Sequence, residues 1–169
     1  MNRIYLDNNA TTKPDPLVVE AVKESLELCW GNPSSLHRRG QEARAVIDRA
    51  RRSVARLIGA VSDSIVFTSG GTEANNLALF GVAMAGYGKK MHIITSAIEH
   101  QSVLNSCRAL ERLDFEVTYI PVDGGGRVDV QTVADAIRPD TAIISIMHAN
   151  NDTGVMQPLR AISALARER

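Results

Sequence analysis

The chain has 169 residues, of which 44% are apolar and 22% are charged, and its formal net charge is zero. This composition is typical of a soluble globular domain, and the lack of a basic excess argues against nucleic acid or an anionic membrane as a partner. Cys29 and Cys107 show neither CxxC nor metal-ligand spacing, which argues against a disulfide framework and favours a reducing compartment. The first residues resemble no signal peptide, and no apolar run approaches the roughly 20 residues of a membrane span. We therefore expect a cytoplasmic protein.

Residues 1–15 are predicted to form an N-terminal arm, with a short strand at residues 4–6. Asp15 and Pro16 are typical of the N-cap and the first turn of a helix. We expect this helix to run to about Leu28.

Residues 16–60 are predicted to make up an N-terminal helical segment, which contains a longer helix over residues 38–58 with Gly59 as its C-cap. Its apolar residues recur at the spacing of a buried stripe. Its other face carries arginines, which suit a phosphate-binding surface or, more commonly, a solvated face. The stripe comprises Ala43, Val46, Ile47, Ala50, Val54, Leu57 and Ile58, and the arginines are Arg44, Arg49, Arg51, Arg52 and Arg56.

Strands and helices alternate over residues 61–169, which predicts an α/β fold. Crossovers longer than about a dozen residues require a mainly parallel sheet flanked by helices, here with about four strands. The nearly all-apolar strand at 141–147 should be buried on both faces. The other strands are expected at 65–68, 92–95 and 115–122, and the helices at 73–85, 102–113, 130–137 and from Pro158 onward. The helix at 73–85 should face inward through Ala74, Leu77, Ala78, Gly81 and Val82.

Open parallel sheets bind ligands at the carboxyl ends of their strands, which selects the loops 69–72, 97–100 and 148–154. In the first loop, Gly70 and Gly71 let backbone N–H groups approach an anion, and Thr72 adds a hydroxyl at a helix N-terminus. The loop therefore has the parts of a phosphate site. A tight turn that merely needs glycines is the alternative.

The other two loops add a flat ring and amides. His100 suits a satisfied structural histidine, a metal ligand or a ring that stacks on another ring, although no second metal ligand lies at helical spacing. Asn150 and Asn151 are donors or acceptors, or they simply cap the turn. Together the loops would supply what pyridoxal phosphate needs: a phosphate anchor, a stacked ring and a hydrogen bond to its phenolic oxygen.

Five ordered motifs resemble the cysteine desulfurases, pyridoxal-phosphate enzymes with the class V aminotransferase fold, and the match is colinear from residue 3 onward. The motifs are YLDNNATT (5–12), GNPSSLH (31–37), FTSGGTEANNLAL (67–79), EHQSVLNSC (99–107) and SIMHANNDTG (145–154).

The resemblance implies a role for residues in each of these loops. Gly71 and Thr72 would hold the cofactor phosphate, and His100 would stack on the pyridine ring and assist proton transfer as a catalytic residue. Asn151 would bond to the phenolic oxygen. Asp152 stands where the family commonly has glutamate, a conservative change from which we expect little loss. The substrate side of the pocket would be formed by Asn9, Ala10 and Thr11.

The resemblance also implies an activity and partners. Family members take sulfur from L-cysteine, leave L-alanine and carry the sulfur as an enzyme persulfide to iron–sulfur cluster assembly or tRNA thiolation. We expect a homodimer, or pairing with a complementary C-terminal half, and an iron–sulfur scaffold or another sulfur acceptor as partner. Family members are more than twice as long, and their Schiff-base lysine and persulfide cysteine lie in the later part. The chain alone is therefore expected to be inactive.

No lysine of this chain is expected to replace the missing one. Lys13 lies in a polar turn, Lys23 lies on an amphipathic helix, and Lys89 and Lys90 precede a strand at the opposite end of the sheet. Cys107 falls at apolar helical spacing and is expected in the core. Two alternatives stay open: a non-catalytic interaction module that keeps the fold, and a sister class V enzyme such as a selenocysteine lyase.

Overall fold

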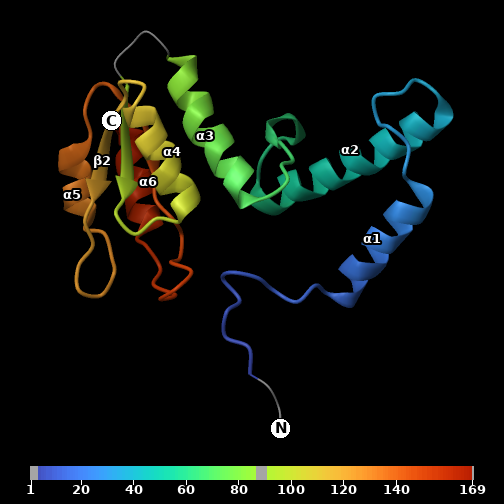
Figure 1. Ribbon diagram of the computed structural model, residues 1–169, viewed down its shortest axis with the longest axis horizontal. Helices are drawn as coiled ribbons and strands as arrows, with labels where there is room; N and C mark the ends of the chain where they lie inside the picture. The colour runs from blue at the N-terminus through green and yellow to red at the C-terminus, as the bar shows by residue number, and fades with distance from the viewer. Residues whose placement is uncertain (1–3, 87–90, 169) are drawn as a thin grey trace. The chain divides into compact units, whose positions relative to one another are not determined.

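The computed structural model in Figure 1 describes residues 4–86 and 91–168. The chain divides into two compact units. The sheet unit comprises Met1–Thr12 with Thr68–Arg169, and the helical unit comprises Lys13–Phe67. The predicted domain boundaries after residues 15 and 60 stay predictions.

The helical unit contains α1 (Pro16–Leu28), α2 (Arg38–Ile58) and the short 3-10 helix η1 (Ser62–Ser64). The predicted start of α1 is confirmed, because the Asp15 carboxylate accepts a hydrogen bond from the Leu17 N–H at 2.8 Å and Pro16 is in the first turn. The predicted C-cap is also confirmed, because Gly59 adopts the left-handed conformation with φ of 69°.

The apolar stripe of α2 is less buried than the sequence predicts. Ala43 is buried, whereas Leu57 is 85% exposed and Ile58 is 64% exposed. The prediction of a continuous buried stripe is wrong, since α1 buries none of its residues and α2 buries only Gly40, Ala43 and Ala55. A unit this small has too little apolar surface to cover a 21-residue helix.

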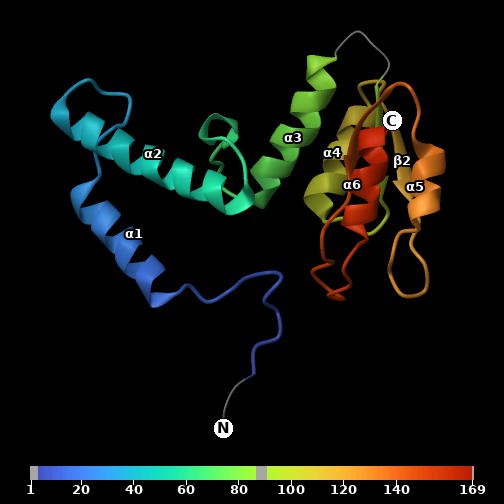
Figure 2. The same cartoon turned by 180° about the vertical axis from the view of Figure 1, so that it is seen from behind.

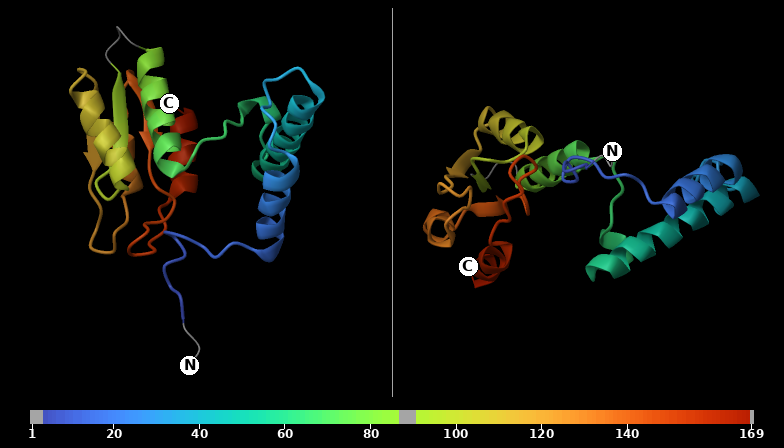
Figure 3. Two further views of the ribbon diagram at one scale, coloured as in Figure 1. Left: turned by 45° about the vertical axis from the view of Figure 1, so that its right-hand side comes forward. Right: turned by 90° about the horizontal axis from the view of Figure 1, so that it is seen from below.

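The sheet unit is an α/β structure, as predicted. Its three strands run parallel in the order β2-β1-β3. Helices α3 and α4 cover one face of the sheet, and α5 and α6 cover the other, as Figures 2 and 3 show. The elements are α3 (Gly71–Ala85), β1 (His92–Ser96), α4 (Gln101–Glu111), β2 (Glu116–Ile120), α5 (Val130–Ala136), β3 (Thr141–Ser145) and α6 (Leu159–Glu168).

The central strand β1 supplies both faces of the core, because successive side chains of a strand point to opposite faces. Ile93 packs in one apolar cluster and Ile94 in the other. The first cluster holds Leu79, Ala83, Val103, Cys107, Leu110 and Phe115 beside Ile93, and the second holds Ile120, Val128, Val133 and Ile162 beside Ile94.

Two strands predicted from apolar runs, the arm strand and the first of about four sheet strands, are absent from the described residues, which contain three strands. Residues 4–6 and 65–68 are not in strands, and their apolar side chains are exposed, with Leu6 at 88%, except for the half-buried Ile65. A strand needs a hydrogen-bonded neighbour, and neither segment has one in the part of the chain described here. β3 is half-buried along its length rather than buried, because it lies at an edge of the sheet.

The inward face of α3 also differs from the prediction. Of the residues expected to face inward, Val82 is half-buried and the others are exposed, whereas Leu79 and Ala83 are buried. Helix α3 is thus rotated about its axis relative to the prediction, and this rotation follows from polar contacts with α4. Asn75 donates to the Ser102 hydroxyl at 2.8 Å, and Asn76 accepts from the Ser106 hydroxyl on the next turn of α4 at 3.0 Å. The exposed residues are Ala74, Leu77, Ala78 and Gly81.

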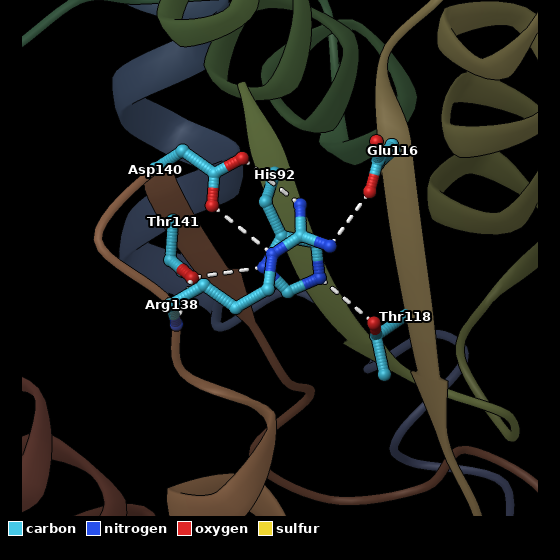
Figure 4. Close-up of polar contacts among 6 residues, drawn as sticks. All are labelled: His92, Glu116, Thr118, Arg138, Asp140 and Thr141. Atoms are coloured by element: carbon cyan, nitrogen blue, oxygen red, sulfur yellow. Dashed lines mark hydrogen bonds and ion pairs between the residues drawn. The ribbon is translucent and has the colours of Figure 1, made fainter. Parts of the chain in front are cut away.

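A buried histidine ties the three strands together at their amino ends (Figure 4). His92 on β1 is 1% exposed. Its Nδ1 pairs with the Thr141 hydroxyl on β3 at 2.8 Å, and its Nε2 pairs with the Thr118 hydroxyl on β2 at 2.7 Å. Both ring nitrogens are thus used by neighbouring strands.

Arg138 covers this histidine and forms ion pairs with Glu116 at 2.6 Å and Asp140 at 3.0 Å. Burial lowers the pKa of His92, and the positive charge of Arg138 lowers it further, while Asp140 and Glu116 oppose the shift. The folded state therefore favours the neutral imidazole.

We predict that His92 makes the sheet unit less stable in mild acid. Because its folded-state pKa lies below the unfolded value of about 6.5, the unfolded chain takes up the proton first as the pH falls. The free energy of unfolding should drop as the pH falls from about 6.5 toward the folded-state pKa. Urea unfolding at stepped pH should show a shallower drop for His92→Gln, which does not titrate. Equal pH dependence in both proteins would contradict this account.

Candidate functional site

The loop before α3 is organised by Glu73. One oxygen of its carboxylate accepts from the backbone N–H and from the hydroxyl of Ser69, both at 2.6 Å. The Ser69 hydroxyl and N–H lower the pKa of Glu73, so this carboxylate stays ionised at neutral pH. Both donors of Ser69, its backbone N–H and its hydroxyl, are therefore already bonded to Glu73. The open donors of the loop are those of Gly71 and Thr72, because the first N–H groups of a helix have no acceptor within it.

Neither glycine of this loop is required by the turn itself. Gly70 has a φ of 166°, which is extended backbone that other residues adopt, and Gly71 begins α3 without a left-handed φ. A Cβ added at either position would meet no atom within 4 Å. The local geometry therefore does not support the alternative that the turn merely needs glycines. Open space in front of a helix N-terminus suits an anion.

His100 forms the N-cap of α4 and keeps part of its ring exposed. Its Nδ1 accepts from the Ser102 N–H at 3.1 Å and lies 2.8 Å from the Ser102 hydroxyl. The accepting role of Nδ1 assigns the ring proton to Nε2 in the neutral form. His100 therefore caps α4, as a structural histidine would, and it also presents an exposed ring with a free N–H.

The Ser102 hydroxyl links His100 to the first loop. It accepts from the Asn75 amide at 2.8 Å, one turn beyond Thr72 on α3. A chain of hydrogen bonds therefore runs from the N-terminal turns of α3 to the His100 ring. This chain brings the first and second sequence-predicted loops together.

In the third loop Asn150 is the turn cap and Asn151 is the more accessible amide. Asn150 is buried, and its Oδ1 accepts from the N–H groups of Asp152 and Thr153 at 3.0 and 2.9 Å. Asn151 is half-buried and donates to the Asp152 carboxylate at 2.8 Å. An amide nitrogen carries two protons, so one donor of Asn151 stays available to a ligand.

The N-terminal arm reaches the same loop. The Asn9 amide donates to the backbone carbonyl of Asn150 at 3.3 Å. Asn9 lies in a turn in which the Asp7 carbonyl accepts from the N–H groups of Ala10 and Thr11, both at 3.2 Å. The predicted substrate-side residues thus lie beside the loop that carries Asn151.

Sequence reasoning missed Glu99, which is 7% exposed and lies directly before His100. Its Oε1 accepts from the Ser96 hydroxyl and from the Met147 N–H, both at 2.7 Å. Burial raises the pKa of Glu99, and these two hydrogen bonds oppose the rise. The sequence signal that could have identified it is a glutamate three residues after Ser96, the hydroxyl-bearing last residue of the buried strand β1.

Cys107 and the lysines were not expected to take part in the active site. Cys107 is 0% exposed, which confirms it as a core residue, and burial raises its pKa to about 11. Lys13 is exposed, and Lys23 is an exposed side chain 3.9 Å from Glu20. Lys89 and Lys90 lie outside the described residues.

The arginine face of α2 borders a cleft in the helical unit that also contains carboxylates. Arg51 donates to the Ile65 carbonyl and lies 5.1 Å from the centroid of the Phe67 ring, while Arg44 lies 4.0 Å from Asp48. The lining is Arg44, Asp48, Arg51, Arg52, Ser62 and Asp63. Since these charges partly offset one another, the cleft gives little support to the phosphate reading.

Across residues 4–86 and 91–168, no helix is long and apolar enough to cross a membrane. Within the same residues, no three histidine, cysteine or acidic side chains gather in a way that could hold a metal ion.

The chain belongs to the class V aminotransferase family, whose family model matches residues 4–169. It is 52% identical over 165 residues to the cysteine desulfurase IscS of Dictyoglomus turgidum, a match that covers 98% of this chain and 42% of the relative. The chain thus spans less than half the length of this relative and matches the N-terminal part of the family.

Solved structures give the same relationship. A NifS-like protein superposes with a TM-score of 0.92 at 38% identity, covering 99% of this chain and 46% of its own. SspA in complex with cysteine superposes with a TM-score of 0.91 at 41% identity, covering 97% of this chain and 47% of its own. The predicted family and fold class are therefore confirmed.

We predict that the Ser102 hydroxyl both stabilises the sheet unit and orients His100. Ser102→Ala leaves the partly buried Asn75 donor without its acceptor, which should cost about 1–3 kcal/mol in urea unfolding. The His100 ring should also lose its fixed orientation, seen as altered imidazole nitrogen shifts in NMR.

Ser106→Ala is the matched control, since Ser106 is also a buried serine of α4 that bonds α3. It should lower stability by a similar amount and leave the His100 shifts unchanged. Identical His100 shifts in wild type and Ser102→Ala would contradict the assignment.

Proposed function

We propose that the chain binds pyridoxal 5'-phosphate and forms the cofactor-binding part of a cysteine desulfurase. The observation that carries the proposal is the hydrogen-bonded chain from Asn75 through Ser102 to His100, which couples the N-terminal turns of α3 to an exposed ring. A phosphate-bearing aromatic cofactor fits this pairing. The names of the relatives favour desulfurase over a sister class V activity.

Each residue has a defined task in this proposal. The N–H groups of Gly71 and Thr72, with the Thr72 hydroxyl, hold the phosphate, and the partial positive charge of α3 favours its negative charge. His100 stacks on the pyridine ring and offers Nε2 for moving a proton. Asn151 donates its second N–H to the phenolic oxygen. The substrate lies on the side of Asn9, Ala10 and Thr11, and the bound cofactor supplies an electron sink for the reacting carbon.

The net reaction transfers one sulfur atom. L-cysteine and an enzyme thiol give L-alanine and an enzyme persulfide, so that the thiol is sulfurated while the cysteine carbon skeleton gains hydrogen. Neither Lys13 nor Lys23 has the desolvated surroundings of a Schiff-base lysine, and burial holds Cys107 as the unreactive thiol. None of the described lysines therefore suits the Schiff base, and we propose that the chain alone is inactive and requires a complementary C-terminal half, in cis or as a partner.

The proposal extends to the setting of the complete enzyme. It would work as a homodimer in the cytoplasm. It would pass its sulfur to an iron–sulfur scaffold or to an acceptor for thiolated products.

We predict that Gly71→Pro weakens cofactor binding whereas Gly71→Ala does not. Proline is tolerated in the first turn of a helix but removes the N–H that would bond the phosphate, and alanine keeps that N–H. Loss of one hydrogen bond to a charged group should raise the Kd for pyridoxal phosphate about tenfold or more in a fluorescence titration.

Circular dichroism and urea unfolding should show that both Gly71 variants fold like the wild type. Equal affinity of the two variants would remove Gly71 from the phosphate site.

We predict that the cofactor binds this chain without a covalent bond. Reduction with borohydride followed by mass spectrometry should leave no stoichiometric adduct, and L-cysteine should yield no alanine. Adding a separately expressed C-terminal half of a relative should restore alanine formation. A stoichiometric adduct at one lysine would overturn the claim that the chain lacks a Schiff-base residue, and no alanine with either half would count against the desulfurase reading.

A further inference from the structure

The two loops that carry His100 and Asn151 leave neighbouring parallel strands. The register pairs Thr95 of β1 with Ser145 of β3, the last paired residues of this ladder. Past this pair the two segments need other contacts to stay together. Two buried side chains supply hydrogen bonds from one loop to the other.

Glu99 makes the first cross-link. A single carboxylate oxygen accepts from Ser96, at the end of β1, and from the Met147 N–H, just after β3. Both distances are 2.7 Å, short bonds of the kind made by a charged acceptor. The carboxylate is thus a bridge between the strand ends, and it is one residue away from His100.

Asn150 makes the second cross-link in the opposite direction. Its amide nitrogen donates to the Ile98 carbonyl at 3.2 Å, while its Oδ1 caps the turn that begins with Asn151. Glu99 and Asn150 are both 7% exposed. Each loop therefore contributes one buried polar side chain that bonds the backbone of the other.

We propose that Glu99 is a positioning residue of the cofactor site, acting with Asn150 to hold the His100 loop and the Asn151 loop at one fixed spacing. The inference rests on the proposed function, since it explains how a ring and an amide from separate loops reach the same cofactor. Glu99 touches neither cofactor nor substrate in this role. It acts through the Met147 backbone and through its neighbour His100.

The first test measures the cross-link in the chain without cofactor. Hydrogen exchange by NMR should show that the protection factor of the Met147 amide falls at least about tenfold in Glu99→Ala. Glu99→Gln keeps an acceptor oxygen and should retain the protection. Val133→Ala is the control for general destabilisation, because Val133 is fully buried on α5, in the apolar cluster that contains Ile94.

Comparable loss of Met147 protection in Val133→Ala, or none in Glu99→Ala, would overturn the cross-link. Ser96→Ala removes only the hydroxyl donor and provides a milder variant should Glu99→Ala fail to fold. It should weaken the Met147 protection less than Glu99→Ala and more than Glu99→Gln.

The second test measures pyridoxal phosphate affinity by fluorescence titration. Glu99→Ala should raise the Kd about tenfold, with Glu99→Gln and Val133→Ala within about threefold of wild type. Unchanged affinity in Glu99→Ala would overturn the positioning role. A wild-type chain that does not bind the cofactor would overturn the proposed function and the cofactor role of Glu99, while the exchange rates would still decide whether the loops are cross-linked.

Discussion

Parallel pairing of β1 with both β2 and β3 is the constraint on which the sheet unit depends. Strands that run the same way gather all their carboxyl ends at one edge, together with the polar loops that follow them. The buried polar groups of those loops must find partners, and Glu99 and Asn150 provide them across the gap. At the other edge His92 and Arg138 are satisfied by neighbouring side chains. The carboxyl edge keeps the exposed ring of His100 and the open donors at the start of α3.

Sequence predicted the local features of the fold well and the tertiary features less well. The cap at Asp15 and the left-handed Gly59 depend on residues one turn away, so local patterns were enough. The buried face of α3 depends on its partner helix. Asn75 and the neighbouring turn bond α4, which turns Leu79 into the core and leaves Leu77 exposed. No composition or spacing rule contains that information.

The candidate site divides in the same way. The three loops were identified because each follows an apolar run, and the parallel rule places such loops at one edge. The residues that join the loops, Glu99 and Ser102, were missed, since their partners lie on other elements. Which backbone group Glu99 meets depends on the β1–β3 register, in which Thr95 faces Ser145. That register is set by the packing of the whole unit.

The central claim is that the carboxyl edge of the sheet binds pyridoxal phosphate. A titration of the isotope-labelled chain followed by amide NMR tests it most directly. The account predicts shift changes concentrated at Gly71, Thr72, His100 and Asn151, with the amides around His92 at the opposite edge unchanged. Shift changes at the amino edge, or none at Gly71 and Thr72, would contradict the account.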